Sequence, residues 1–175
     1  MKDNKKILIM CEGPNELAVI NILLENKRFK FSNDDLLNLV PYHSRQISGV
    51  VKTSLNLYSG YVIILRVGDT LNDKLKLRGY NDKVKEVYKI CTKPELEMLL
   101  IIAEGLVYDY NKYKSKEDAK SYAKSNIKLG KKKYDNSTKF FVDYFGDNVD
   151  LLVESIKRYK HIKKHNRDEY FLADL

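Results

Sequence analysis

The chain has 175 residues, of which 43% are hydrophobic and 32% charged, and its formal net charge is +8 at pH 7. This length suits one domain better than two, because each of two separate cores would be marginal. The composition excludes wholesale disorder, and the longest apolar stretches, such as 62–65 and 99–103, are too short to cross a bilayer. With no signal-peptide pattern at the N-terminus, we expect a cytoplasmic protein with no membrane association.

The first predicted elements are a strand, a tight turn and a helix. Residues 6–10 form a continuous apolar run behind a basic start, which is typical of a strand buried on both faces of a parallel sheet. The run leads into Glu12 and Gly13, and Pro14 suits the first position of a helix. Apolar residues at helical spacing over 17–24 predict that this helix buries one face.

The next stretch predicts three more strands. Residues 36–42, 61–67 and 85–91 have the apolar and β-branched character of strands. A helix is predicted over 46–58, and 72–77 is expected to be helical or irregular. Alternating strands and helices predict βαβ units, and therefore an α/β fold with a parallel sheet of about four strands flanked by helices.

The C-terminal part is basic and has a helical pattern. A helix is predicted to begin near Pro94, and a last helix to begin at about Val149. Between residues 111 and 139 there are ten lysines and only three acidic residues. We therefore divide the single predicted domain into a core of about 1–107 and a basic helical extension of about 108–175.

Acidic residues follow two of the predicted strands at the point where each strand ends. Glu12 comes after the first strand, and Asp69 follows the third strand directly after Gly68. Ligands of open parallel sheets bind at the carboxyl ends of the strands, so we expect both side chains at one functional edge. Carboxylate oxygens are the ligands that Mg²⁺ and Mn²⁺ prefer, and the pattern therefore predicts a site for one of these ions.

These segments resemble those of a known family, the Toprim-domain proteins. Residues 8–16, Leu-Ile-Met-Cys-Glu-Gly-Pro-Asn-Glu, are similar to the Toprim opening motif, an apolar strand that ends in Glu-Gly with another acid one helical turn later. Residues 63–69 resemble the strand that delivers the Toprim Asp-x-Asp motif. Residues 93–100 resemble the proline-led, glutamate-bearing helix of RloB-like and OLD-type relatives. The segments 119–124 and 155–160 are loosely similar to the C-terminal part of RloB-like proteins.

The resemblance implies a Toprim-like (Rossmann-like) fold and gives roles to particular residues. It implies that Glu12 is a general acid/base or metal ligand, that Asp69 is the main metal ligand, and that Glu97 is a further catalytic acid. In two-metal chemistry such acids hold the ions that clamp the attacking and leaving oxygens of a phosphodiester. The family's second aspartate is expected at position 71, where this chain has Leu71. Either Asp73 replaces it as a metal ligand, or the site has lost metal binding and catalysis.

The resemblance also implies a function, a nuclease that hydrolyses DNA or RNA with Mg²⁺ or Mn²⁺ and acts in antiphage defence by abortive infection. It further implies an ATPase partner protein, because the chain has no nucleotide-binding motif of its own. The rival interpretation is a catalytically degenerate Toprim-like binding module that holds nucleic acid or a partner protein. Leu71 favours that alternative.

Basic residues are candidates for binding a nucleic-acid backbone, because side chains that neutralise phosphates release counterions. Tyrosines that lie among the lysines could stack exposed bases. A solvated helical face is an equal alternative for the lysines, and a strand-face ion pair is the alternative for Arg66. The tyrosines are Tyr110, Tyr113, Tyr122 and Tyr134. The candidates for the backbone are Arg66, Lys128, Lys131, Lys132, Lys133, Lys157, Lys160 and Lys164.

Each candidate acid also has a purely structural interpretation. Glu12 and Glu97 lie where acids favour the helix dipole, and Asp69 fits a turn or cap position. We interpret Glu16 as a solvent-facing residue of the first helix and Glu95 as an acid in the first turn of its own helix. These last two residues are left out of the predicted site.

Overall fold

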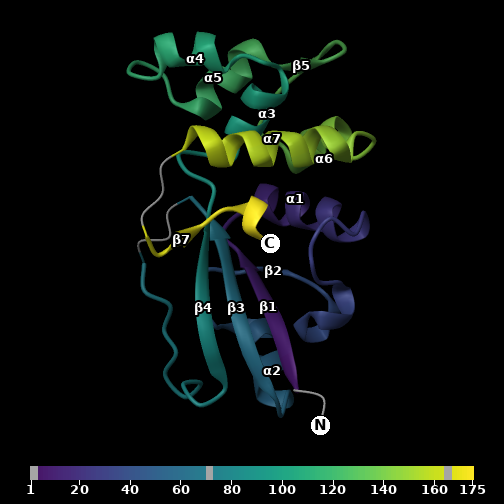
Figure 1. Cartoon of the computed structure of the whole chain (residues 1–175), viewed down its shortest axis with the longest axis vertical. Helices are drawn as coiled ribbons and strands as arrows, with labels where there is room; N and C mark the ends of the chain where they lie inside the picture. Colours follow the sequence, from purple (N-terminus) through teal and green to yellow (C-terminus); the bar gives the residue numbers. More distant parts are fainter. Residues whose placement is uncertain (1–3, 70–72, 164–166) are drawn as a thin grey trace.

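The computed structural model describes residues 4–69, 73–163 and 167–175. Figure 1 shows two stacked parts, a sheet whose long strands run side by side and a group of helices packed on the end where those strands finish. The long strands are β1 (Lys5–Cys11), β3 (Tyr61–Gly68) and β4 (Val84–Cys91). The carboxyl ends of these strands therefore face the helical part.

The described residues form a five-stranded parallel sheet in the order β2-β1-β3-β4-β7. This arrangement confirms the predicted α/β fold, in which a parallel sheet is flanked by helices. The sheet has one strand more than the four expected, because residues near the C-terminus return to its edge and pair with β4. The two short edge strands are β2 (Tyr42–His43) and β7 (Glu169–Tyr170).

The predicted strand over 36–42 is wrong for most of its length. A 3₁₀ helix, η2 (Leu37–Leu39), occupies its middle, and only β2 remains as a strand. The backbone has a φ of 55° at Asn38 and 66° at Leu39, in the left-handed region that a strand cannot contain. The apolar run reflects burial of Leu36 and Leu37, which short turns achieve as well as a strand does.

Two helices accompany the first strands. α1 (Pro14–Glu25) follows β1, and Pro14 lies in its first turn as predicted, where a missing N–H removes no helical hydrogen bond. α2 (Gly49–Leu57) is shorter than the helix predicted over 46–58, because the backbone at Ser48 is still extended. Both helices are therefore present, with boundaries that shift by a few residues at most.

The connection from β3 to β4 and the helix after β4 follow the sequence pattern more loosely. Residues 73–77 are irregular, which is one of the two predicted alternatives. α3 (Met98–Ala103) begins four residues after Pro94, and Gly105 follows its end with a φ of 70°. The chain between Pro94 and α3 therefore makes a turn, and the helix start predicted near Pro94 is wrong by four residues.

The remaining elements form most of the helical part. They are α4 (Val107–Tyr113), α5 (Ala119–Asn126), β5 (Lys128–Leu129), β6 (Lys132–Lys133), α6 (Thr138–Phe145), α7 (Val149–Ile162) and η3 (Leu172–Asp174). A further 3₁₀ helix, η1 (Asn33–Asp35), follows α1 in the chain. α7 confirms the predicted last helix, and it buries Leu152, Ile156 and Tyr159. Across the described residues, no helix combines the length and apolar character that crossing a membrane requires.

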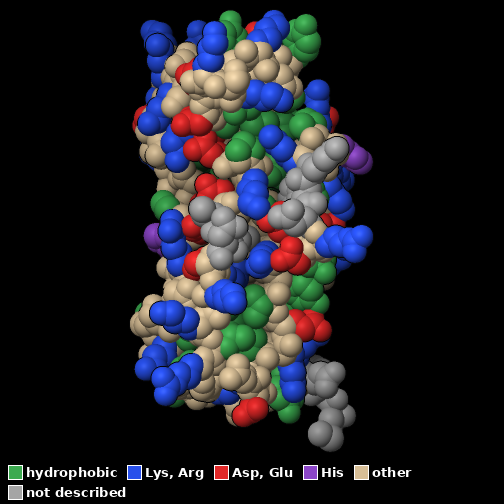
Figure 2. All heavy atoms as spheres, turned by 90° about the vertical axis from the view of Figure 1, so that its left-hand side faces the viewer, with side chains coloured by type: hydrophobic (Ala, Val, Ile, Leu, Met, Phe, Trp, Pro, Cys, Tyr) green, Lys and Arg blue, Asp and Glu red, His purple; other side chains and the backbone are tan. Residues whose placement is uncertain are grey.

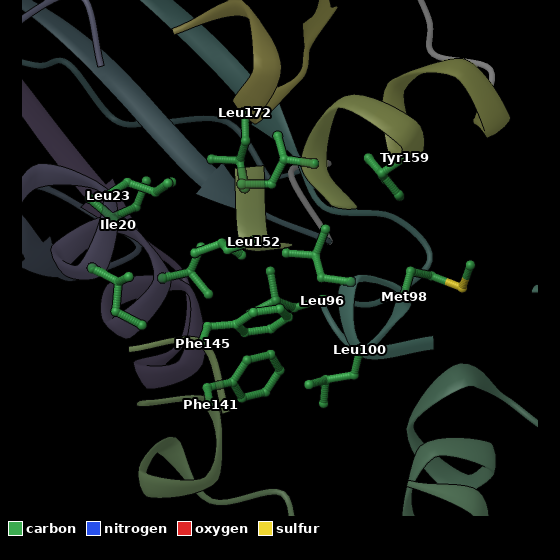
Figure 3. Packing of buried hydrophobic residues seen from close by; sticks show 14 of the residues in the cluster. Ile20, Leu23, Leu96, Met98, Leu100, Phe141, Phe145, Leu152, Tyr159 and Leu172 are labelled. Atoms are coloured by element: carbon green, nitrogen blue, oxygen red, sulfur yellow. The ribbon is translucent and has the colours of Figure 1, made fainter. Parts of the chain in front are cut away.

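The sheet separates two hydrophobic clusters. Along β1, Leu8 and Met10 belong to the smaller cluster, which includes α2, whereas Ile9 and Cys11 belong to the larger one. This alternation is the period of two that a strand imposes on its side chains. The larger cluster packs α1, α3, α6 and α7 together (Figure 3). The basic extension therefore shares one core with the strands, and this packing fixes it over their carboxyl ends.

Candidate active site

The carboxyl ends of β1 and β3 bring two predicted acids to one place. The strands are neighbours with Cys11 opposite Val67, and the ladder continues as the N–H of Glu12 donates to the carbonyl of Val67 at 2.8 Å. Asp69 follows directly after Gly68, the last residue of β3. Both side chains line the same cavity. Glu12 and Asp69 therefore lie together at one edge of the sheet, as the sequence predicts.

This cavity has a volume of about 220 Å³ and lies between the sheet edge and the helical part. Its walls also include the first residues of α1 and α5 and the segment before α3. Acids outnumber cations in its lining, so the cavity is negative although the whole chain is positive. Among the described residues, the acids that line it are Glu12, Glu16, Asp69, Glu95 and Glu97, and the cations are Arg45 and Lys120.

The glycine at the end of β3 allows Glu12 to lie across that strand. A Cβ atom on Gly68 would come within 2.7 Å of the Cβ of Glu12, closer than real side chains approach one another. The Glu12 side chain is 9% exposed, and its Oε1 lies 3.2 Å from a guanidinium nitrogen of Arg45. Gly68 therefore provides the space for this carboxylate, and Arg45 holds it by charge.

Glu16 is a residue of the cavity that the sequence interpretation placed in solvent, and that interpretation is wrong. The pKa of Glu16 is raised to about 7, chiefly by burial and then by the charges of Asp69, Glu97 and Glu12, while a hydrogen bond from its own backbone N–H opposes the shift. The available signal was its position in the first turn of α1, four residues after Glu12. A helix that begins at Pro14 keeps Glu16 close to the strand end.

Glu97 is buried, with 3% of its surface exposed, immediately before α3. Its Oε1 accepts a hydrogen bond of 2.7 Å from the hydroxyl of Tyr134. Burial, and then the charge of Glu97, raise the pKa of Tyr134 well above its usual range. The hydroxyl therefore stays protonated and acts as the donor in this hydrogen bond. Glu97 is thus fixed in the cavity wall, whereas the structural interpretation expected only a helix-start acid.

Glu95 is the second acid that the sequence interpretation left out of the site. Its Oε2 accepts a hydrogen bond of 2.6 Å from the backbone N–H of Lys120, and its Oε1 lies 3.9 Å from the Lys120 ammonium. Burial raises the pKa of Glu95. This pair joins the start of α5 to the segment before α3, so it closes one side of the cavity.

Asp73 and Arg66 pair with each other and do not join this site. The Arg66 guanidinium donates to the Asp73 carboxylate at 2.8 Å, and Gln46 donates to its second oxygen at 2.8 Å. The hydrogen bond from Arg66 lowers the pKa of Asp73. Arg66 itself is buried, so it adopts the strand-face ion pair and offers no exposed contact for phosphate. Leu71 lies outside the described residues.

The donor set of the cavity suits a hard divalent cation, although the side chains do not converge on one point. In the described ranges, no group of three or more histidine, cysteine, aspartate or glutamate side chains is placed to hold a metal ion. Contacts with Arg45, Lys120 and Tyr134 hold several acids at separate places on the wall. Mg²⁺ usually takes one or two carboxylates, with water and substrate phosphate completing its shell. Two carboxylates at one sheet edge fit that requirement.

The predicted phosphate-binding lysines that the structure describes lie on the β5–β6 hairpin and on α7. Figure 2 shows Lys and Arg side chains spread over one face of the molecule with acidic side chains between them. On α7, Lys160 forms an ion pair with Asp174. Lys164 lies outside the described residues. The exposed candidates are Lys128, Lys131, Lys132 and Lys133 of the β5–β6 hairpin, and Lys157 and Lys160 of α7.

The tyrosines among these lysines do not form a stacking surface. Tyr110, Tyr122 and Tyr134 are buried, and their rings pack inside the helical part. Tyr113 is exposed but its ring packs beside that of Tyr122, with the centroids 6.3 Å apart. The expectation that all four could stack on bases is therefore wrong, because three of them are core residues.

Comparison of the chain with protein-family models, with curated proteins and with solved structures gave no match.

Proposed function

We propose that the protein is a metal-dependent phosphodiester hydrolase that cleaves DNA or RNA with Mg²⁺ or Mn²⁺. The observation that carries this proposal is the single cavity of about 220 Å³ lined by five described acids at the carboxyl edge of a parallel sheet. Structures of this kind bind their ligands at that edge. The acids come from separate parts of the chain, which makes their gathering a property of the fold.

The excess of acids over basic residues in the cavity favours binding of a cation. Five described acids face two cations, Arg45 and Lys120, and both cations are already paired with carboxylates. A bound divalent ion would offset the remaining negative charge and would activate water and stabilise charge on the phosphate. Glu12 and Asp69 would hold it from the strand ends. Glu97, fixed by Tyr134, would position water or substrate.

The biological setting follows from the resemblance at 8–16, 63–69 and 93–100. It supports a Toprim-type, RloB-like nuclease in the cytoplasm, active in antiphage defence by abortive infection. An ATPase partner protein belongs to the same proposal.

The test is cleavage of plasmid DNA, single-stranded DNA and tRNA in the presence of Mg²⁺ or Mn²⁺. The informative variants are Glu12→Gln and Asp69→Asn, which keep shape and remove charge. Glu25→Gln is the matched control, because Glu25 is an exposed acid at the far end of α1. We expect the two site variants to lose at least about a hundredfold in rate and the control to keep it. Cleavage at the wild-type rate by both site variants would overturn the proposal.

A second candidate is a degenerate binding module, which is favoured by the absence of a three-ligand group among the described residues. Calorimetry with Mg²⁺ separates the two. A binding module would take up no ion in the cavity, and its affinity for nucleic acid would depend on salt but not on divalent cations. The hydrolase would bind Mg²⁺, and Asp69→Asn would weaken that binding.

A further inference from the structure

We propose that the β5–β6 hairpin is an arm that binds the phosphate backbone of a nucleic acid and holds it beside the acidic cavity. The inference deepens the proposed function and rests on it for the identity of the bound polymer. The arm consists of residues 128–133 and is rooted in the core at Ile127 and Tyr134. The root is buried, whereas the tip is exposed and basic.

Four lysines lie close together at the tip of the hairpin. The register places Lys128 opposite Lys133 and Leu129 opposite Lys132, and the turn between the strands contains Gly130 and Lys131. All four lysines are exposed. Lys132 has a carboxylate partner, Asp135, at 3.4 Å. One acid against four ammonium groups leaves the tip strongly basic.

This arrangement is unfavourable for the isolated hairpin. Like charges directly opposite each other in an antiparallel pair are destabilising, and two-residue strands have little pairing to offset that repulsion. An anionic ligand that sits across the pair removes the repulsion and gains from both charges. Lysine suits phosphate because it offers a compact positive charge that binds from many directions. The tip is therefore built as a phosphate contact.

The root of the hairpin connects the tip to the cavity. The N–H of Tyr134 donates to the carbonyl of Ile127 at 2.9 Å, and its hydroxyl donates to Glu97 at 2.7 Å. Asn136, two residues further on, lines the cavity. Three residues of chain span at most about 10 Å, so the backbone at Lys133 lies within that distance of the backbone at Asn136. This reach corresponds to the rise of about three base pairs along the axis of a duplex.

The arm reads the backbone and not the bases. It consists of four lysines, Leu129 and Gly130 and contains no aromatic residue, and the neighbouring Tyr122 and Tyr134 are buried. Base stacking by aromatic side chains is the usual means of preferring single strands. We therefore expect the arm to bind single-stranded and duplex nucleic acid without sequence preference and with strong dependence on salt.

The first experiment measures affinity in EDTA, so that it does not depend on cleavage. Fluorescein-labelled single-stranded and duplex oligonucleotides are titrated with wild type and with the variant K128Q/K131Q/K132Q/K133Q. The control removes the same charge from exposed lysines of the sheet half, as K5Q/K52Q/K76Q/K85Q. We expect the arm variant to lose about tenfold or more in affinity and to lower the slope of log affinity against log salt by about 2 to 4, and the control to lose less than about threefold.

Equal losses in the two variants would overturn the arm, because binding would then follow net charge alone. Binding of polyglutamate by the wild type, with no binding of either oligonucleotide, would also overturn it and would indicate an acidic protein partner. Absence of cleavage alone contradicts the proposed hydrolase and leaves this affinity result standing, so the two failures are distinguishable.

The second experiment tests whether the bound backbone passes the cavity. Without metal, the acids of the cavity should repel a phosphate held beside them. Asp69→Asn should therefore raise the affinity for the same oligonucleotides in EDTA by about two- to fivefold, whereas Glu25→Gln, a control remote from the cavity, should raise it less. Equal affinities for wild type and Asp69→Asn would show that the backbone lies elsewhere.

Discussion

The acidic cavity and the lysine hairpin meet at Tyr134, yet they are built in opposite ways. The acids stand on the ends of long strands and on helix starts, with Glu97 buried and Glu12 largely so. The lysines stand on two-residue strands and are exposed. Charges that are held in place by a core suit chemistry, because their positions are fixed before a substrate arrives. Exposed charges on a short hairpin suit capture of a polymer, because they can adjust to it.

The largest effect on stability is expected where the sheet makes room for Glu12. Gly68→Ala should lower the free energy of unfolding by about 3 kcal/mol, because the new Cβ would lie 2.7 Å from the Cβ of Glu12. Gly13→Ala is the matched control, since its Cβ would meet at 2.6 Å only the flexible end of Glu16. Urea unfolding measures both, and a smaller loss for Gly68→Ala than for Gly13→Ala would contradict the packing described here.

The next effect on stability concerns the hydrogen bond between Tyr134 and Glu97, which links the hairpin to the cavity. Tyr134→Phe keeps the buried ring but removes the donor to Glu97, so we expect a loss of about 2 kcal/mol in the free energy of unfolding at pH 8. Tyr108→Phe, at an exposed tyrosine of α4, is the control and should change stability by less than about 0.5 kcal/mol. Equal stability of wild type and Tyr134→Phe would mean that the hydroxyl does not fix Glu97.

A third effect depends on pH. The folded state raises the pKa of Glu16 from 4.5 to about 7, so it binds a proton that the unfolded state has already released between these values. Stability therefore falls as pH rises through this window and stays lower above it. Without divalent cations, Glu16→Gln should raise the free energy of unfolding at pH 8 by about 1 to 2 kcal/mol.

The same variant should change little at pH 4, where Glu16 is protonated in the folded state and mostly protonated in the unfolded state. Thermal unfolding at the two pH values gives the comparison. A Glu16→Gln protein that is equally stabilised at pH 4 and pH 8 would show that burial of charge is not the cause.

The smallest expected effect is on the stability of the hairpin alone. Lys128→Gln removes one of two lysines that face each other, so it should stabilise the hairpin by about 0.3 kcal/mol while weakening nucleic-acid binding. Hydrogen exchange of the hairpin amides measures the first change, and the anisotropy titration measures the second. Lys52→Gln on α2 should change neither, and faster exchange in Lys128→Gln would contradict repulsion between the facing lysines.

The sequence predicts the sheet and the edge acids because strands leave a strong local signal. Apolar runs locate β1, β3 and β4, and parallel pairing then brings Glu12 and Asp69 to one edge. The run at 36–42 has a similar composition, but positive φ at two of its residues breaks the strand. Asn38 and Pro41 are the signals against a strand in this run, because asparagine tolerates the left-handed region and proline cannot donate to a strand ladder.

The rest of the site depends on contacts between distant parts of the chain. Glu16 and Glu95 are ordinary helix-start acids in sequence, and only packing turns them toward the cavity. Asp73 looks available as a ligand until Arg66 binds it, and the ion pair depends on how the chain returns from β3. Tyr134 lies 37 residues from Glu97, so no local pattern could predict their hydrogen bond.

The most direct test of the account is a crystal structure of the protein soaked in Mn²⁺, with the ion located by its anomalous signal. We predict an ion in the acidic cavity, coordinated by carboxylate oxygens of Glu12 and Asp69 at about 2.1 to 2.3 Å. The same soak of Asp69→Asn should show a weaker signal or none. A cavity without Mn²⁺ at millimolar concentration, in crystals where Glu12 stays bound to Arg45, would contradict the metal-dependent site.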